Sequence, residues 1–149
     1  MKVIVRRFKV FEDSGIIFST FPKGVYYGLE TIPEEPKREW FSRYYETTRE
    51  LLENADIRIA CRDDDHDFIV GYAIINFDTC EFVYVKEGYR KQGIATLLIP
   101  DNINKFNNIT KIGKVILDAR NSRTIKEETR TEAETDRSTI LHDESGNGD

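Results

Sequence analysis

The chain has 149 residues, of which 39% are hydrophobic and 33% charged, and its formal net charge at pH 7 is −5. This length predicts one domain large enough to bury a core, and the negative charge argues against a nucleic-acid-binding protein. Two cysteines are too few for a disulfide framework, and the longest apolar runs fall far short of the ~20 residues that a membrane-spanning helix needs. We therefore expect a soluble, cytoplasmic protein with buried free thiols and no membrane partner.

The N-terminal third contains one clear strand and one clear helix. Residues 2–8 alternate between apolar and polar side chains, as a half-buried strand does. Residues 11–28 contain scattered aromatic residues and a turn signal at 22–24, so a short helix and an irregular loop both stay open. In residues 36–54, aromatic and apolar side chains recur at helical spacing with charged residues between them, which predicts an amphipathic helix.

The middle of the chain predicts an antiparallel meander. Residues 57–61 and 68–77 have the composition of strands, and an acidic turn at 62–67 joins them. A short turn then leads into a further strand, and strands joined by short polar turns pair antiparallel. The acidic turn contains four aspartates and His66 but lacks the Gly and the final Glu of a calcium loop. We expect a solvated hairpin tip there and no bound metal.

The stretch from Cys80 to Ile99 combines a strand, a basic turn with glycines and an apolar helix. Residues 80–85 are rich in β-branched and aromatic side chains, and residues 86–92 contain Gly88 and several cationic or amide side chains. A helix that begins at Gly93, directly after such a turn, leaves main-chain N–H groups unpaired, and these suit a phosphate group. Pro100 should end or kink this helix.

Val85, Arg90, Gly93 and Ala95 are spaced as V-x-x-x-x-R-x-x-G-x-A. This spacing resembles the signature of the GNAT superfamily of acyl-CoA N-acyltransferases, whose usual form is Q/R-x-x-G-x-G/A. The resemblance implies an α/β (α+β) fold of GNAT type, with a mixed, mostly antiparallel twisted central sheet flanked by helices. A strand-turn-helix connection in another α/β domain, with solvated basic residues, is the other interpretation.

The resemblance also implies a binding site for acetyl-CoA as cosubstrate. In the family, main-chain groups of the central strand bind the pantetheine arm, and amides of the following turn hold the pyrophosphate. The corresponding residues here are Val83, Tyr84 and Val85 for the arm, and Arg90, Lys91, Gln92, Gly93, Ile94, Ala95 and Thr96 for the pyrophosphate.

Glu81 occupies the position where the family often carries its general base, or a residue that orders water toward that base. A solvent-facing glutamate on an alternating strand is an equally good interpretation of this residue. The family usually also carries a tyrosine near its C-terminus that protonates the departing thiolate, but no tyrosine follows Tyr89 in this chain.

The C-terminal part divides at residue 120. Residues 115–119 predict a strand, which in the resembled fold would be splayed from the central strand so that the pantetheine arm lies between the two. Residues 121–149 contain four basic and eight acidic residues and no aromatic residue. We expect residues 1–120 to form a GNAT-like domain and residues 121–149 to form a polar acidic tail, disordered or bound to a partner. The C-terminal strands of the family would then be missing or atypical.

Two functions of different classes follow. The first is an N-acetyltransferase that moves an acetyl group from acetyl-CoA to an amine of a small molecule or protein by direct transfer, without a metal. The second is a catalytically inactive GNAT-like binding or assembly protein, for example a component of a phage virion. Its tail would contact a partner or a second copy, and its location would be the virion instead of the cytoplasm. The intact cofactor loop favours the first.

Overall fold

The computed structural model describes residues 1–107. Its elements in chain order are β1 (Val3–Arg7), α1 (Val10–Tyr27), α2 (Lys37–Asn54), β2 (Asp56–Arg62), β3 (Asp65–Asn76), β4 (Thr79–Val85), α3 (Ile94–Leu98) and β5 (Lys105–Phe106). The five strands form one sheet in the order β1-β2-β3-β4-β5. The first three pairings are antiparallel and the last is parallel, which confirms the predicted mixed, mostly antiparallel sheet. The expected strand at 115–119 and the tail at 121–149 lie outside the described residues.

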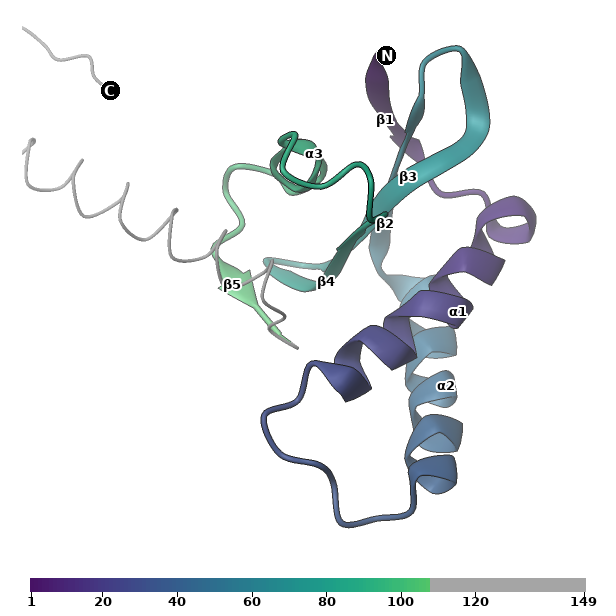
Figure 1. Cartoon of the computed structure of the whole chain (residues 1–149), viewed down its shortest axis with the longest axis vertical. Coiled ribbons are helices and arrows are strands. Elements are labelled where there is room, and N and C mark those ends of the chain that lie inside the picture. The colour runs from purple at the N-terminus through teal and green to yellow at the C-terminus, as the bar shows by residue number, and fades with distance from the viewer. Residues whose placement is uncertain (108–149) are drawn as a thin grey trace, which may run out of the picture.

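Helices cover both faces of the sheet, with α1 and α2 on one face and α3 on the other (Figure 1). The face under α1 and α2 carries an aromatic cluster of buried residues: Ile17, Phe21, Val25, Trp40, Ile57, Ile59, Ile69, Tyr72, Ile74 and Phe82. The face under α3 carries an aliphatic cluster: Ala60, Val70, Ala73, Ile75, Cys80, Val83, Val85, Ile94, Leu98, Ile99 and Ile103. Burying apolar side chains on both faces is what holds the helices against the sheet.

Helix α1 resolves the segment that the sequence left open. It runs for 18 residues although it contains Pro22 and Gly24, two residues that disfavour helix. Gly24 is needed for packing, because a Cβ atom there would lie 2.5 Å from the ring of Phe82 on β4. The helix is thus stabilised by its contact with the sheet more than by local preference.

The start of α1 is tied to β1 by a buried ion pair. The guanidinium of Arg6 donates to both carboxylate oxygens of Asp13, at 2.8 and 3.0 Å, and the N–H of Lys9 donates to Asp13 at 2.7 Å. Burial alone would raise the pKa of Asp13. The hydrogen bonds from Arg6 and Lys9 outweigh that effect, so the pKa of this carboxyl group lies below its ordinary value.

Helix α2 confirms the amphipathic helix that the sequence predicts over residues 36–54. Trp40 and Thr48 are buried, and the ring of Trp40 stacks on that of Tyr44 at 4.7 Å between centroids.

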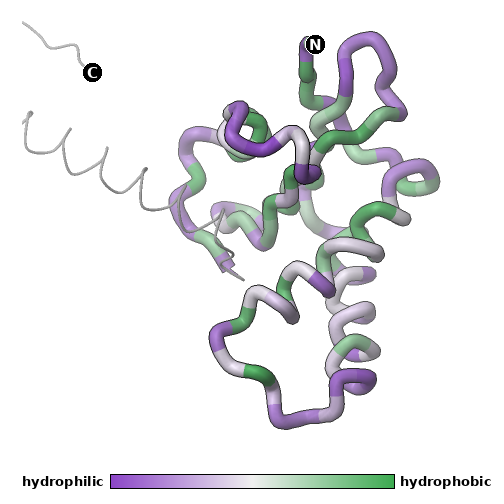
Figure 2. Tube along the Cα trace, in the orientation of Figure 1, coloured by the Kyte–Doolittle hydropathy of each residue, from purple (hydrophilic) through white to green (hydrophobic). Residues whose placement is uncertain are grey.

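The hairpin between β2 and β3 is hydrophilic at its tip, as the purple segment in Figure 2 shows. Strand β3 begins at Asp65, so the turn is shorter than the predicted 62–67. No helix in residues 1–107 has the length and apolar character of a membrane span.

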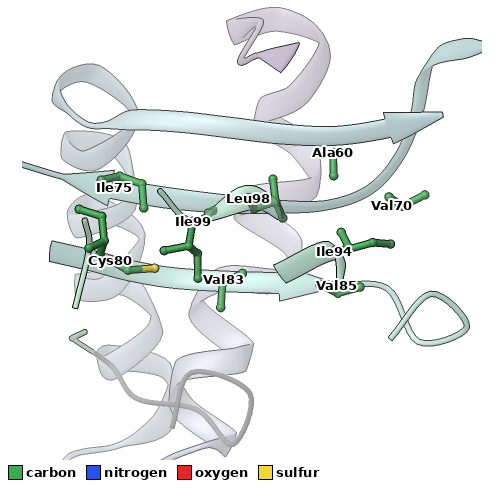
Figure 3. Packing of buried hydrophobic residues seen from close by; sticks show 11 residues of the cluster. Ala60, Val70, Ile75, Cys80, Val83, Val85, Ile94, Leu98 and Ile99 are labelled. Atoms are coloured by element: carbon green, nitrogen blue, oxygen red, sulfur yellow. The ribbon is translucent and has the colours of Figure 1, made fainter. Parts of the chain in front are cut away.

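Helix α3 is only five residues long and ends before Pro100, as the sequence predicts. Its buried residues Ile94 and Leu98, together with Ile99, face Val83 and Val85 of β4 in the aliphatic cluster (Figure 3). A helix this short has little stability of its own in water. Its place therefore depends on the packing of these side chains.

Candidate functional site

Strand β4 is only partly paired on the side away from β3. Strand β5 pairs with Thr79 and Cys80 at the start of β4, and no described strand pairs with residues 82–85 on that side. The carbonyl oxygen of Tyr84 faces β3. A Cβ atom added to Gly71 of β3 would lie only 2.5 Å from that oxygen. Successive residues of a strand point their main-chain groups to opposite sides. The N–H and C=O groups of Val83 and Val85 therefore face the open side.

A β-bulge interrupts β4 at Glu81. Ile74 of β3 pairs with Phe82 and Ile75 pairs with Cys80, which leaves Glu81 as the extra residue. As a result, Cys80 packs in the aliphatic cluster while Phe82 packs in the aromatic cluster, although two residues apart normally share a face. The bulge thus sets Glu81 apart from the regular ladder.

Glu81 is half-buried, and its carboxylate is held from the neighbouring strand. The side-chain amide of Asn107, directly after β5, donates to the two carboxylate oxygens at 3.2 and 3.3 Å. No sequence pattern signals this contact, because the two residues are 26 positions apart and Asn107 belongs to no motif. Glu81 is therefore neither a simple core residue nor a freely solvated one.

The turn after β4 has an unusual backbone. Gly88, Lys91 and Gly93 have φ angles of 90°, 65° and 82°, in the left-handed region that most residues avoid. At both glycines a Cβ atom would meet nothing within 4 Å, so glycine is needed for its conformation and the space beside it is open. The N–H of Lys86 donates to the carbonyl of Val70, which joins the start of the turn to β3.

Several main-chain donors of this turn have no acceptor in the described part of the chain. Among residues 1–107, none accepts a hydrogen bond from the N–H groups of Lys91, Gly93, Ile94, Ala95 or Thr96. Lys91, Gln92, Gly93 and Thr96 are exposed to solvent. The turn therefore presents several N–H groups to the solvent at one end of β4, an arrangement that suits an anionic group.

Arg90 has a different role from the one its charge suggests. Its Nε–H donates to the carbonyl of Val85 at 2.7 Å, so the guanidinium closes the turn back onto the end of β4. Of the predicted pantetheine-binding residues, only Val83 and Val85 present main-chain groups to the open side, and Arg90 already occupies the carbonyl of Val85. The main chain of Tyr84 faces β3 instead.

A family model described as "Acetyltransferase (GNAT) family" matches residues 24–125. The chain belongs to the GNAT acetyltransferase family. This match includes β4, the turn and α3, and it therefore spans the residues from Val85 to Ala95. Among curated proteins, none matches this sequence.

The chain is also similar, at low sequence identity, to several solved structures. YjaB from Escherichia coli has 16% identity and a TM-score of 0.47, with 66% of this chain and 62% of that chain covered. Glucosamine-6-phosphate N-acetyltransferase from Arabidopsis thaliana has 12% identity and a TM-score of 0.45, with 100% and 97% covered. The acetyl-CoA-bound YncA from Salmonella typhimurium has 17% identity and a TM-score of 0.39, with 66% and 59% covered. The chain thus spans less than two thirds of the length of YjaB and of YncA.

The tyrosines nearest the turn after β4 are packed against other rings. The ring of Tyr84 lies 5.5 Å from that of Tyr72, and the ring of Tyr89 lies 6.1 Å from that of Phe68. Burial raises the pKa of Tyr72 despite the 2.6 Å hydrogen bond between its hydroxyl and Thr20. Tyr72 is therefore a poor proton donor to a substrate.

In residues 1–107, no group of three or more His, Cys, Asp or Glu side chains could hold a metal ion.

Proposed function

We propose that this GNAT chain is an N-acetyltransferase that moves an acetyl group from acetyl-CoA to an amine by direct transfer. The observation that carries the proposal is the turn after β4. Its N–H groups at Lys91, Gly93 and residues 94–96 lack acceptors in the described chain, and the space beside Gly93 is open. A pyrophosphate group matches both features, because it offers several anionic acceptors and needs close approach to the backbone.

The open side of β4 fits the pantetheine arm. The N–H and C=O of Val83 and the N–H of Val85 face this side without a described partner strand. The arm contains amide groups, so it could pair with these groups as a short strand would. Within residues 1–107, β5 pairs only with Thr79 and Cys80, so the proposal places the arm along β4 beyond Glu81.

The chemistry assigns one role to Glu81. When bound, acetyl-CoA supplies an acetyl group as a thioester, and transfer forms a bond from the amine nitrogen to the acetyl carbon as the carbon–sulfur bond breaks. Glu81 accepts the proton that the amine nitrogen gives up. The sulfur takes its proton from water, since a free thiol has a pKa of about 8.5 and its thiolate is readily protonated near neutral pH. In this proposal, the N–H of Val83 polarises the thioester carbonyl.

The test is a two-substrate assay on the full chain. Acetyl-CoA binding is measured by calorimetry, and a panel of small amines and peptides is screened for acetylation by mass spectrometry. Direct transfer predicts intersecting initial-velocity plots, and Glu81→Gln should lower kcat by roughly 10²-fold or more while acetyl-CoA still binds. Failure of the folded wild-type chain to bind acetyl-CoA would overturn the proposal.

A further inference from the structure

Asn107 directly follows β5 and lies beside β4. Phe106, the last residue of β5, is paired with Cys80 of β4. The N–H of Asn107 then donates to the carbonyl of Cys80 at 2.9 Å, and this is the final main-chain bond between the two strands in the described chain. Beyond this point the open side of β4 begins, where the proposed function places the pantetheine arm.

The side chain of Asn107 reaches one residue further along β4 than its main chain does. Its Nδ2 lies 3.2 Å from one carboxylate oxygen of Glu81 and 3.3 Å from the other. The main-chain bond holds the backbone of Asn107 next to Cys80, and the side-chain bonds hold the carboxylate of Glu81 in place. Because Glu81 is the extra residue of the bulge, the regular ladder does not orient it.

We propose that Asn107 is a positioning residue that holds the Glu81 carboxylate beside the part of β4 that no described strand covers. The inference rests on the proposed function, in which Glu81 takes the proton of the acceptor amine. Orientation of a base within hydrogen-bond reach of its proton is a large part of its effect on rate. Asn107 supplies that orientation from its position directly after β5, which belongs to no sequence motif of the site.

An amide suits this role better than a cation would. A neutral donor orients the carboxylate without adding a positive charge, so the carboxylate keeps its ability to accept a proton. The nearest described cation on β5, Lys105, pairs with Asp78 of the β3–β4 turn at 3.0 Å, and both side chains are exposed. The charges of Lys105 and Asp78 therefore balance each other beside Asn107.

The first test reads the contact without relying on turnover. In the full chain labelled with ¹⁵N, the side-chain amide signals of Asn107 should shift with pH as the Glu81 carboxylate is protonated. This shift should disappear in Glu81→Gln, and Asn107→Ala should identify the signals. A titration that is unchanged in Glu81→Gln would overturn the inference.

The second test separates positioning from simple support of β5. Asn107→Ala should lower kcat by roughly tenfold and leave the calorimetric affinity for acetyl-CoA within about twofold of wild type. Asn107→Asp places a second carboxylate beside the first, so the acidic limb of the pH–rate profile should move to higher pH. Lys105→Ala breaks the exposed ion pair on the same strand and is the matched control, with kcat unchanged.

The outcomes distinguish the inference from the function beneath it. If Glu81→Gln is inactive and Asn107→Ala behaves like Lys105→Ala, the positioning role is wrong and the proposed function stands. If Glu81→Gln and Asn107→Ala both keep full activity, the assignment of Glu81 as the base is wrong and the inference falls with it. If wild type acetylates no amine, the proposed function and the inference both fall.

Discussion

The two faces of the sheet are built in different ways. The aromatic cluster lies under two helices of 18 residues each, and its rings contact one another across α1, α2 and β4, as in the 5.0 Å pair of Phe21 and Phe82. The aliphatic cluster lies under α3, which has five residues, and its described members are small or branched aliphatic side chains and Cys80.

This difference teaches that the two faces have separate tasks. The long helices of the aromatic face supply most of the helical structure in the described chain. The short helix of the aliphatic face directly follows the turn with the free N–H groups, so its packing decides where the turn lies. We expect damage to the aromatic face to lower stability alone, and damage to the aliphatic face to lower both stability and affinity for acetyl-CoA.

The largest combined effect is expected for Leu98→Ala on the aliphatic face. Leu98 is fully buried, and loss of such a side chain costs about 2–5 kcal/mol of unfolding free energy. Because Leu98 fixes α3 on the sheet, affinity for acetyl-CoA should also fall by about tenfold or more, which corresponds to at least ~1.4 kcal/mol. Urea unfolding and calorimetry at a temperature where the variant is folded measure the two effects. Unchanged affinity for acetyl-CoA in Leu98→Ala would contradict the expectation that the aliphatic face positions the turn.

Ile17→Ala is the matched substitution on the aromatic face. Ile17 on α1 is also fully buried, so the expected loss of unfolding free energy is again about 2–5 kcal/mol. Its affinity for acetyl-CoA should stay within about twofold of wild type, since α1 contacts neither the turn nor α3 through this residue. A loss of affinity equal to that of Leu98→Ala would show that the faces are not separate.

Arg90 tests whether the turn acts through its backbone or its charge. Arg90→Lys keeps the charge but loses the planar guanidinium whose Nε–H donates to Val85, so it should weaken acetyl-CoA binding about as much as Arg90→Ala. Arg90→Lys should leave the salt dependence of the Kd unchanged, whereas Arg90→Ala and Lys91→Gln should each reduce it by removing an exposed charge. Wild-type affinity in Arg90→Lys would assign the effect to charge.

The smallest effect concerns pH and the start of α1. The pKa of Asp13 is below its ordinary value in the folded chain, so its ionisation stabilises the fold above the unfolded pKa. This contribution should be lost as the pH falls from about 4 toward the folded pKa. Thermal unfolding of wild type and Asp13→Asn between pH 3 and 7 measures it. The difference between the two should shrink in acid, and a constant difference would argue against this role.

Local sequence patterns predicted the elements whose stability is local. The aromatic stripe predicted α2, alternation or β-branched and aromatic composition predicted β1 to β4, and Pro100 predicted the end of α3. Helix α1 was left open because Pro22 and Gly24 disfavour helix. At Gly24 the helix packs closely against the ring of Phe82, and no local pattern reveals that contact.

The candidate site was predictable as a motif but not as a geometry. The spacing from Val85 to Ala95 identified the turn, while its left-handed Lys91 and the bond that Arg90 makes to β4 appear only in three dimensions. The two-residue strand β5 is too short for any periodicity, so the link from Asn107 to Glu81 had no signal in the sequence. Contacts between distant residues are fixed by the fold and not by local preference.

The central claim is that the backbone of the turn binds the pyrophosphate of acetyl-CoA. The most direct measurement compares Gly93→Asp with Gly93→Asn by calorimetric titration with acetyl-CoA. Both side chains have similar size, both tolerate the left-handed conformation, and the space beside Gly93 is open, so the two variants should fold alike. We predict that both variants bind acetyl-CoA more weakly than wild type, because either side chain occupies space beside the backbone, and that Gly93→Asp loses at least tenfold more affinity than Gly93→Asn through charge repulsion. Equal affinity in the two variants would contradict the claim.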